Sequence, residues 1–244
     1  MTASEELIDL WSRCEQVVVL TGAGTSTDSG IPDFRGPNGL WTKDPSTQSM
    51  FDIDSYISDP DVRLRAWRGR RSHPAWDAQP NAAHFALTEL QNAGRLGPVI
   101  TQNIDGLHQA AGSKPVLELH GTIWDTVCLS CGQLTPTLDT LSRPEPDPHC
   151  EVCGGILKTA TISFGQSLDP DVLDTAITAA RTADLLVAIG TSLQVMPAAA
   201  LVDMAKHLAI VNAEPTPYDQ QADLVVNDPI STVLPAVAAE LSRP

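Results

Sequence analysis

Apolar residues in this chain gather in short runs, and each run ends in a polar or glycine turn. Such runs occupy residues 16–20, 97–102, 116–119, 183–190 and 207–212. They have the length of β-strands, and they are compactly apolar instead of alternating with polar residues. Runs of this kind are typical of strands in a parallel sheet that is buried on both faces.

Before and between several of these runs, apolar residues recur with helical spacing. We expect helices over residues 5–13, 81–93, 171–181 and 197–206. Strands that alternate with helices predict an α/β fold, a Rossmann-like parallel sheet with helices on both faces.

Two stretches interrupt this alternation. Residues 38–78 read as mostly helical and polar, and residues 123–158 carry four cysteines and four prolines with little periodicity. We expect the two stretches to form a small domain, made of a helical module and a zinc-binding module. The remaining residues, 1–37, 79–122 and 159–244, are then expected to form the main, nucleotide-binding domain.

The charge of the chain narrows its possible partners. Fifteen Lys and Arg stand against thirty Asp and Glu in 244 residues, a formal net charge of −15. Such a surface repels nucleic acids and anionic membranes. The sequence also lacks an apolar run of membrane-spanning length and the pattern of a signal peptide. We therefore expect a cytoplasmic protein with neither nucleic acid nor membrane as partner.

Four of the five cysteines follow the pattern Cys128-x2-Cys131-x18-Cys150-x2-Cys153. In a reducing compartment, two such pairs predict a zinc site and not a disulfide framework. Each pair turns two thiolates toward one point, and four thiolates complete a tetrahedron around Zn²⁺. Since four protein ligands close the coordination sphere, we expect the zinc to be structural. Cys14 stands alone and is expected to be a small core residue.

A glycine-rich loop follows the first apolar run. Gly22-Ala23-Gly24 is the first half of a dinucleotide fingerprint, in which glycines let the backbone approach a pyrophosphate. The pattern departs from the usual one, because Thr27 stands where the third glycine belongs and no acidic residue follows a second strand. Alone, the motif does not distinguish a nucleotide site from a plain turn.

Other polar turns are predicted at the same edge of the sheet. Gly190-Thr191-Ser192 suits phosphate or ribose hydroxyls, and Asn212-Ala-Glu214 places a carboxylate that suits a ribose diol. Ligands of open α/β sheets bind beyond the carboxyl ends of the strands. Residues 101–105 and His120 follow two further strands, and His120 is the histidine at the exit of an apolar run. The ordinary pKa of histidine suits a general base at neutral pH. Serine-hydrolase and zinc-protease motifs are lacking.

Taken together, several blocks resemble the sirtuin family of NAD-dependent protein lysine deacylases, in particular bacterial members with little beyond the core domain. The blocks lie in family order and consist of Gly22–Gly36, Thr101–His108, Leu119–Thr122, the four cysteines and Gly190–Ser192.

The resemblance implies an NAD site. Its residues in this chain are Gly22, Ala23, Gly24, Thr25, Ser26, Ile31, Asp33, Phe34, Arg35, Gln102, Asn103, Ile104, Asp105, Gly190, Thr191, Ser192, Asn212, Glu214 and Ile230. The catalytic residues that it implies are His120, Asn103 and Asp105.

The resemblance also implies a reaction. The carbonyl oxygen of an acylated lysine attacks the ribose C1′ and expels nicotinamide, which gives an alkylimidate. His120 then takes a proton from the ribose diol, and the products are lysine, nicotinamide and 2′-O-acyl-ADP-ribose. The partner is thus an acylated lysine of a protein substrate, and we expect the enzyme to be a monomer.

Substrate contacts are implied at two segments, through Phe164 and Gly165 and through Leu193 and Val195, which sandwich the peptide as an added strand. The chain departs from the family at Gln166, where an acid is usual. Members that remove succinyl or malonyl groups carry Tyr-x-x-Arg, and Trp67-x-x-Arg70 is the nearest stretch here. Arg70 can bind a carboxylate, but a solvated basic helix face explains it equally well. We favour deacetylation and leave other acyl groups open.

A zinc-ribbon nucleic-acid binder is opposed by the net charge and by the few lysines around Cys128–Cys153. Two other functions compete with the deacylase interpretation. An NAD-dependent protein ADP-ribosyltransferase would share the cleavage of nicotinamide, and a non-catalytic module would merely sense NAD. His120 argues against the first, because only the collapse of the imidate needs that base. A module that only senses NAD has no need of the polar residues Asn103, Asp105 and His120.

Overall fold

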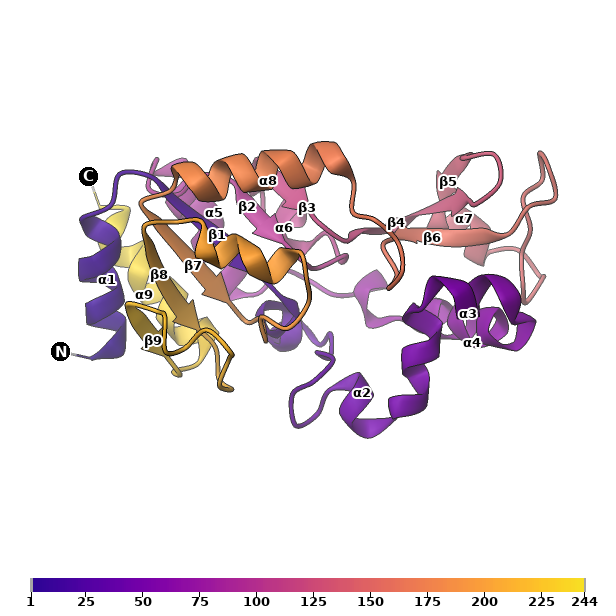
Figure 1. Cartoon of the computed structure of the whole chain (residues 1–244), viewed down its shortest axis with the longest axis horizontal. Helices are drawn as coiled ribbons and strands as arrows, with labels where there is room; N and C mark the ends of the chain where they lie inside the picture. The colour runs from indigo at the N-terminus through magenta and orange to yellow at the C-terminus, as the bar shows by residue number, and fades with distance from the viewer. Residues whose placement is uncertain (1, 244) are drawn as a thin grey trace.

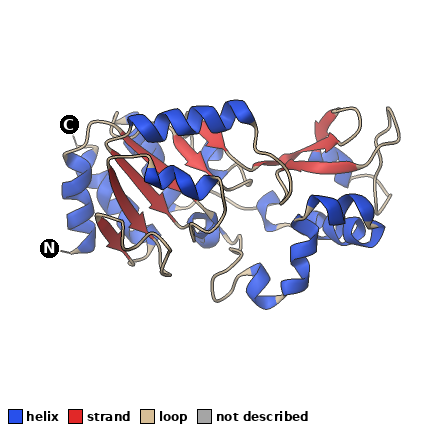
Figure 2. Cartoon of the chain, viewed as in Figure 1, coloured by secondary structure: helices blue, strands red, loops and turns tan. Residues whose placement is uncertain are grey.

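The computed structural model describes residues 2–243, and its larger part is built on a six-stranded sheet (Figures 1 and 2). The strand order is β3-β2-β1-β7-β8-β9, and every neighbouring pair is parallel. The strands are β1 (Val17–Thr21), β2 (Val99–Thr101), β3 (Val116–Glu118), β7 (Leu185–Ile189), β8 (His207–Val211) and β9 (Leu224–Val226).

The apolar runs are explained by two cores, one on each face of this sheet. Val17 and Val19 of β1 belong to one core, and Val18 and Leu20 belong to the other. Because side chains alternate between the faces of a strand and both faces are covered, β1 is apolar throughout. All five predicted strands are present. The expectation that the strand before His120 is buried was wrong, because β3 is an edge strand and is half-buried.

Helices cover both faces, as predicted. On one face α1 (Ala3–Ser12), α5 (Ala82–Asn92) and α9 (Ile230–Leu241) pack against one another, and the core there includes Cys14. On the other face lie α8 (Pro170–Thr182) and the 3₁₀ helix η4 (Ala198–Asp203). The helix expected over 197–206 is therefore wrong in type and too long. Its buried alanines and leucine follow the sheet surface for six residues before the chain enters β8.

A second, antiparallel sheet lies at the far end of the molecule (Figure 1). Its order is β5-β4-β6. The elements of this end are α2 (Leu40–Lys43), η2 (Pro45–Phe51), α3 (Ile53–Ser58), α4 (Pro60–Arg71), η3 (Pro74–Trp76), β4 (Gly121–Cys128), β5 (Leu134–Pro136), α7 (Thr137–Leu141) and β6 (Leu157–Thr161).

Contacts across a long stretch of sequence join the helical and the cysteine-bearing segments. The Tyr56 hydroxyl donates to the Leu157 carbonyl at 2.8 Å, and Arg63 pairs with Asp147 at 3.0 Å. Trp67 of α4 packs in one cluster with Cys128. The two insertions therefore pack as one body, with the cysteines beside α4. No described helix is long and apolar enough to cross a membrane.

Candidate functional site

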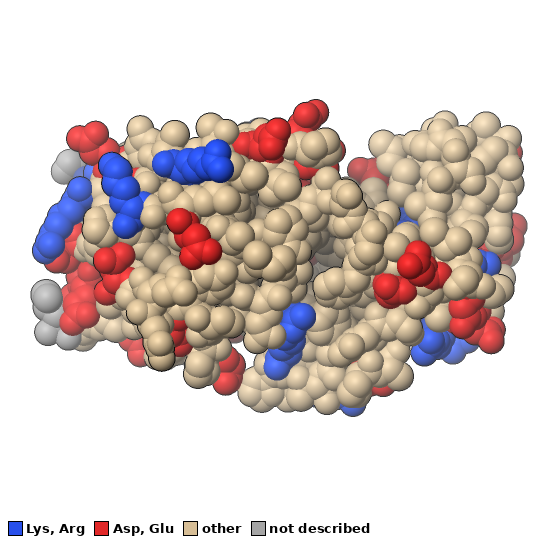
Figure 3. Space-filling view, in the orientation of Figure 1, with Lys and Arg blue, Asp and Glu red and all other residues tan. Residues whose placement is uncertain are grey.

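A cavity of about 1510 Å³ opens where the parallel strands end, between the two sheets. Figure 3 shows a hollow between the two halves of the molecule, bordered mostly by uncharged side chains. Its walls come from the turns after β1, β2, β7 and β8 and from residues of the helical segment. The carboxyl edge of the sheet is thus the place where polar turns meet, as the strand pattern predicts.

The glycine-rich loop lies against the end of β7. The Gly22 N–H donates to the Ile189 carbonyl at 3.0 Å, and the Gly24 N–H donates to the Gly190 carbonyl at 2.8 Å. A Cβ at Gly22 would lie 2.7 Å from the Thr191 Cβ, so a side chain has no space there. The loop then forms a 3₁₀ turn, η1 (Ala23–Ser29). These glycines are therefore needed first for close packing of two strand-end turns, which places both turns at one cavity wall.

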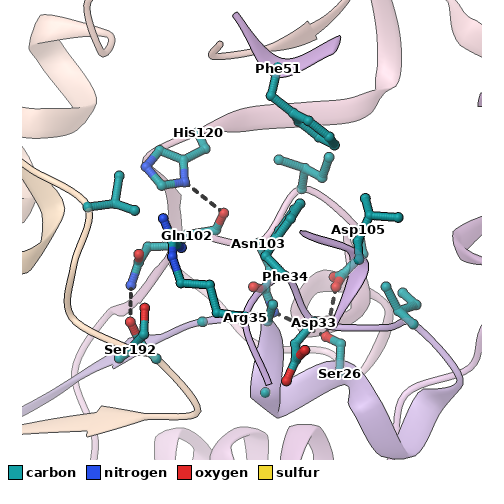
Figure 4. Close-up of a pocket in the computed structure, with 18 of the residues that line it drawn as sticks. Ser26, Asp33, Phe34, Arg35, Phe51, Gln102, Asn103, Asp105, His120 and Ser192 are labelled. Carbon is teal, nitrogen blue, oxygen red and sulfur yellow. Dashed lines mark hydrogen bonds between the residues drawn. The ribbon is translucent and has the colours of Figure 1, made fainter. Parts of the chain in front are cut away.

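A buried polar cluster lies at the inner end of the cavity (Figure 4). The Asn103 Nδ2 donates to the Ser26 hydroxyl at 3.1 Å, and that hydroxyl donates to the Asp105 Oδ2 at 2.7 Å. The Leu107 N–H donates to the other carboxylate oxygen at 2.9 Å. Asn103 and Asp105 are both less than a tenth exposed. The hydrogen bonds thus hold the amide and the carboxylate in one orientation, from two segments of the chain.

His120 faces the same cavity, and its tautomer follows from its contact. Its Nδ1 lies 3.0 Å from the Gln102 carbonyl, which can only accept, so Nδ1 carries the proton and Nε2 keeps its lone pair. Burial lowers the pKa of His120, and the bond to Gln102 acts in the opposite direction. The ring is therefore a neutral base at neutral pH, held by the backbone of its neighbouring strand end.

The four cysteine thiols converge on one point of the antiparallel sheet region, and their Sγ atoms all lie within 4.8 Å of one another. Cys128 Sγ is 3.5 Å from Cys153 Sγ, and Cys131 Sγ is 3.7 Å from Cys150 Sγ. A tetrahedral zinc site with bonds of about 2.3 Å requires sulfur atoms roughly 3.8 Å apart. The thiols are therefore positioned to bind one zinc ion, as their spacing predicts.

Comparison with known proteins identifies the family. The model of the Sir2 family matches residues 22–197. The chain belongs to the Sir2 family. An "NAD-dependent protein deacetylase 2" of Streptomyces coelicolor is 51% identical over 230 residues, covering 91% of this chain and 95% of that protein. An "NAD-dependent protein deacetylase 1" of Pyrobaculum aerophilum is 42% identical and covers 97% of this chain and 94% of its own.

Solved Sir2 structures share the fold over almost the whole chain. A complex titled "Sir2-p53 peptide-NAD+" superposes with a TM-score of 0.86 at 37% identity, covering 97% of both chains. A structure titled "Structural Basis for the Mechanism and Regulation of Sir2 Enzymes" reaches 0.89 at 37% identity, covering 98% of this chain and 97% of the other.

Nearly all of the Sir2-like site residues predicted from the sequence line this one cavity. Among the described residues, the exceptions outside the cysteine cluster are Thr25 and Leu193. Thr25 is buried and its hydroxyl donates to the Ile189 carbonyl at 3.2 Å, so it anchors the loop from beneath. The Leu193 side chain lies in the core on the α8 face and not at the cavity wall.

The main chain of Phe164 differs from what strand addition requires. The Phe164 N–H donates to the Phe51 carbonyl at 2.7 Å, and its carbonyl accepts from the Ile53 N–H at 3.0 Å. Both groups are thus engaged by the helical segment. The Phe164 backbone therefore has neither group free to pair with an added strand, although the residue is 45% exposed.

An aromatic cluster at the cavity wall is not indicated by any motif in the sequence. Phe34 lies 4.8 Å from Trp41 and 5.4 Å from Phe51 between ring centroids, and Trp41 lies 5.9 Å from Phe164. The Arg35 guanidinium stacks 4.6 Å from the Trp41 ring centroid. Trp41 and Phe51 lie in the helical insertion, where their spacing carries no motif. Only the fold brings them to the two phenylalanines of the Sir2 motifs.

Three side chains with N–H donors line one part of the cavity, and the sequence predicted two of them, Trp67 and Arg70, but not Lys158. Trp67 is buried, and its indole Nε1 has no partner among the described residues. Arg70 and Lys158 line the cavity with it and form none of the ion pairs of the described chain. Lys158 donates to the Thr161 carbonyl, and burial, aided by the charge of Arg70, lowers its pKa to about 7. Lys158 escaped prediction because it stands in β6, a buried strand that carries none of the recognised motifs.

Proposed function

We propose that this chain is an NAD-dependent protein lysine deacylase that removes acetyl groups and forms 2′-O-acetyl-ADP-ribose. The observation that carries the proposal is the convergence in one cavity of the glycine loop, the Ser26–Asn103–Asp105 cluster and His120 with its free Nε2. The names of the Streptomyces and Pyrobaculum relatives support the same activity.

Each part of the cavity suits one part of NAD. The backbone of the Gly22–Ser26 loop, with Ser192, suits the pyrophosphate, and Asn212 with Glu214 suits the adenosine ribose. Asn103 and Asp105 offer an amide and a carboxylate to the carboxamide of nicotinamide. When bound, NAD supplies the electrophilic ribose carbon to which the acyl oxygen adds.

The remaining residues handle the proton and exclude water. In this proposal His120 Nε2 accepts a proton from a ribose hydroxyl, and the Gln102 carbonyl, 3.0 Å from Nδ1, stabilises the charged ring. The Phe34 ring, held by Trp41 and Phe51, shields the reacting carbon. Because an acyl oxygen is a poor nucleophile, orienting it and excluding water contribute much of the rate acceleration.

The first experiment is mass spectrometry of an acetyl-lysine peptide incubated with the protein, with and without NAD. NAD-dependent loss of acetyl together with 2′-O-acetyl-ADP-ribose supports the proposal. Nicotinamide release with transfer of ADP-ribose to protein or peptide shows a transferase instead. Absence of reaction across several acyl groups favours a module that only senses NAD.

A pH profile tests the base. Because burial lowers the pKa of His120, the ring stays neutral, and so competent, to a lower pH than an ordinary histidine with pKa 6.5. We expect kcat/KM to be constant through neutral pH and to fall only below that ordinary value. The measurement is the rate of acetyl-peptide turnover against pH at saturating NAD. An acid limb centred above 6.5 contradicts the assignment.

A second candidate activity, removal of acyl groups that end in a carboxylate, is favoured by the donors around Arg70. The unpartnered Trp67 Nε1 and the Arg70 guanidinium line one part of the cavity without an anionic partner. The Lys158 amine lines the cavity beside them, although it already donates to the carbonyls of Thr159 and Thr161. A carboxylate is the group that such donors stabilise best, with Arg70 able to bind it through two nitrogens.

Arg70→Met tests this candidate. We expect wild-type protein to act on a succinyl-lysine peptide and the variant to lose about 10- to 100-fold of that activity, the value of a hydrogen bond to a charged group. Acetyl-peptide turnover is expected to change little, because acetyl has no carboxylate. The matched control is Arg68→Met, an exposed arginine of the same helix. Equal losses of activity on the succinyl and acetyl peptides would show that Arg70 stabilises the fold and does not select the acyl group.

A further inference from the structure

Two buried histidines lie close to the Asn103 cluster without lining the cavity, and the proposed chemistry does not use them. His84 belongs to α5, and His108 belongs to α6 (Leu107–Ala110). They are 0% and 1% exposed, and their ring centroids are 4.8 Å apart with the planes tilted by 58°. Each ring has one nitrogen that is buried without a partner in the described chain, Nε2 of His84 and Nδ1 of His108.

The tautomer of His84 follows from its one contact. The Asn81 N–H donates to the His84 Nδ1 at 3.2 Å, so Nδ1 carries a lone pair. A neutral ring therefore has its proton on Nε2. The unpartnered nitrogen of His84 is a donor.

The tautomer of His108 follows from two hydroxyls. Thr21 donates its hydroxyl proton to the Thr101 Oγ1 at 2.8 Å, so it can only accept from the His108 Nε2, which lies 2.9 Å away. The proton of a neutral His108 is then on Nε2. Its unpartnered Nδ1 is an acceptor, the complement of the donor on His84.

Both rings are neutral near pH 7. Burial lowers the pKa of His84 to about 4, and burial with the nearby His84 lowers the pKa of His108 to about 3. A buried donor and a buried acceptor that both lack partners are unfavourable, and in adjacent rings each can satisfy the other, directly or through one water.

The pair lies between two segments whose neighbouring residues line the cavity. At one end Asn81, the N-cap of α5, donates from Nδ2 to the Thr25 carbonyl at 2.9 Å and to the Ser29 hydroxyl at 3.0 Å. At the other end the Thr101 hydroxyl accepts the Asn103 N–H at 3.0 Å. Hydrogen bonds thus link His84 to the glycine loop through Asn81, and His108 to Asn103 through Thr21 and Thr101, and the two rings lie next to each other between these links.

We propose that His84 and His108, joined Nε2–H to Nδ1, are positioning residues that complete a hydrogen-bond chain holding Asn103 and the glycine loop in the geometry for cleavage of nicotinamide from NAD. This rests on the proposed function. Neither ring lines the cavity, so the pair acts through Asn103 and Asn81.

The kinetic test is His108→Phe, which keeps the ring volume and removes both hydrogen bonds. We expect kcat for nicotinamide release to fall about 100-fold, the scale of a misplaced reacting group, with little change in KM for the acyl peptide. His108→Gln, whose amide can donate to Thr21 and accept from His84, should recover most of the loss. Thr88→Val, which removes a hydroxyl beside His84 but outside the chain of contacts, is the control.

Nitrogen-15 NMR of labelled histidine reports the tautomer and the hydrogen bonding of each ring. A merely structural role of the two histidines does not require a particular tautomer. At neutral pH both rings are expected as Nε2–H tautomers, with the Nδ1 of His108 shifted as a hydrogen-bond acceptor. An Nδ1–H tautomer of either ring overturns the proposal, as does a folded His108→Phe with wild-type kcat, or a His108→Gln no better than the phenylalanine variant. Wild-type protein that is itself inactive with NAD and acyl peptides overturns the proposed function, and this role with it.

Discussion

His120→Ala is expected to lower kcat for deacylation by about 100- to 10,000-fold, the usual contribution of a positioned general base. The imidazole is the group whose free Nε2 faces the cavity, and its Nδ1 proton is held by the Gln102 carbonyl. Alanine removes the base but leaves the glycine loop and the Ser26–Asp105 contact intact. NAD affinity and nicotinamide release should therefore survive better than formation of the acyl-ADP-ribose product.

The measurement separates these steps. Product formation is followed by mass spectrometry, nicotinamide release by exchange of labelled nicotinamide, and NAD binding by calorimetry. His207→Ala is the matched control, because His207 is exposed at the start of β8, the end of the strand opposite to the cavity. Normal turnover by His120→Ala would contradict the assignment of His120 as the general base. Loss of NAD binding in this variant would instead show that the ring serves the nucleotide site.

Cys128→Ala is expected to remove zinc and to unfold the antiparallel sheet with it. Structural zinc sites release about 10–16 kcal/mol of apparent binding free energy, and this energy is part of folding. Cys128 is 1% exposed, ends β4 and packs with Trp67 and Leu157. Loss of the ion therefore also loosens α4 and β6, which carry Arg70 and Lys158 at the cavity.

Zinc content by atomic emission and thermal unfolding by circular dichroism check this result. The variant should lack the bound ion, melt at lower temperature and lose activity, and a strong chelator should reproduce the effect on wild-type protein. Cys14→Ala is the matched control, because Cys14 is buried in the core of the main sheet, away from the cysteine cluster. A stable, active and zinc-free Cys128→Ala protein would refute a structural site.

Local features of the fold could be predicted because they depend on neighbouring residues. The run Val17–Thr21 indicates a strand buried on both faces, and the two Cys-x2-Cys pairs indicate a metal centre wherever they are placed. Burial and helix type were predicted less well, because they depend on residues that are close in space but distant in the sequence. The run before His120 has the composition of a buried strand, but β3 is at the sheet edge and half-buried. Residues 198–203 have helical spacing, but they form a 3₁₀ helix whose buried residues pack into the core on one face of the sheet.

The sequence by itself determined the parallel sheet, the cysteine cluster and the polar turns that meet at the strand ends, because strand period, ligand spacing and turn chemistry are encoded over a few residues. Tertiary structure alone decided that Trp41 and Phe51 meet Phe34, and that Arg70 and Lys158 share one wall. It also decided that His84 faces His108. These residues lie on elements far apart in the chain, and their contacts depend on how the two sheets and their helices pack, which no short pattern of residues contains.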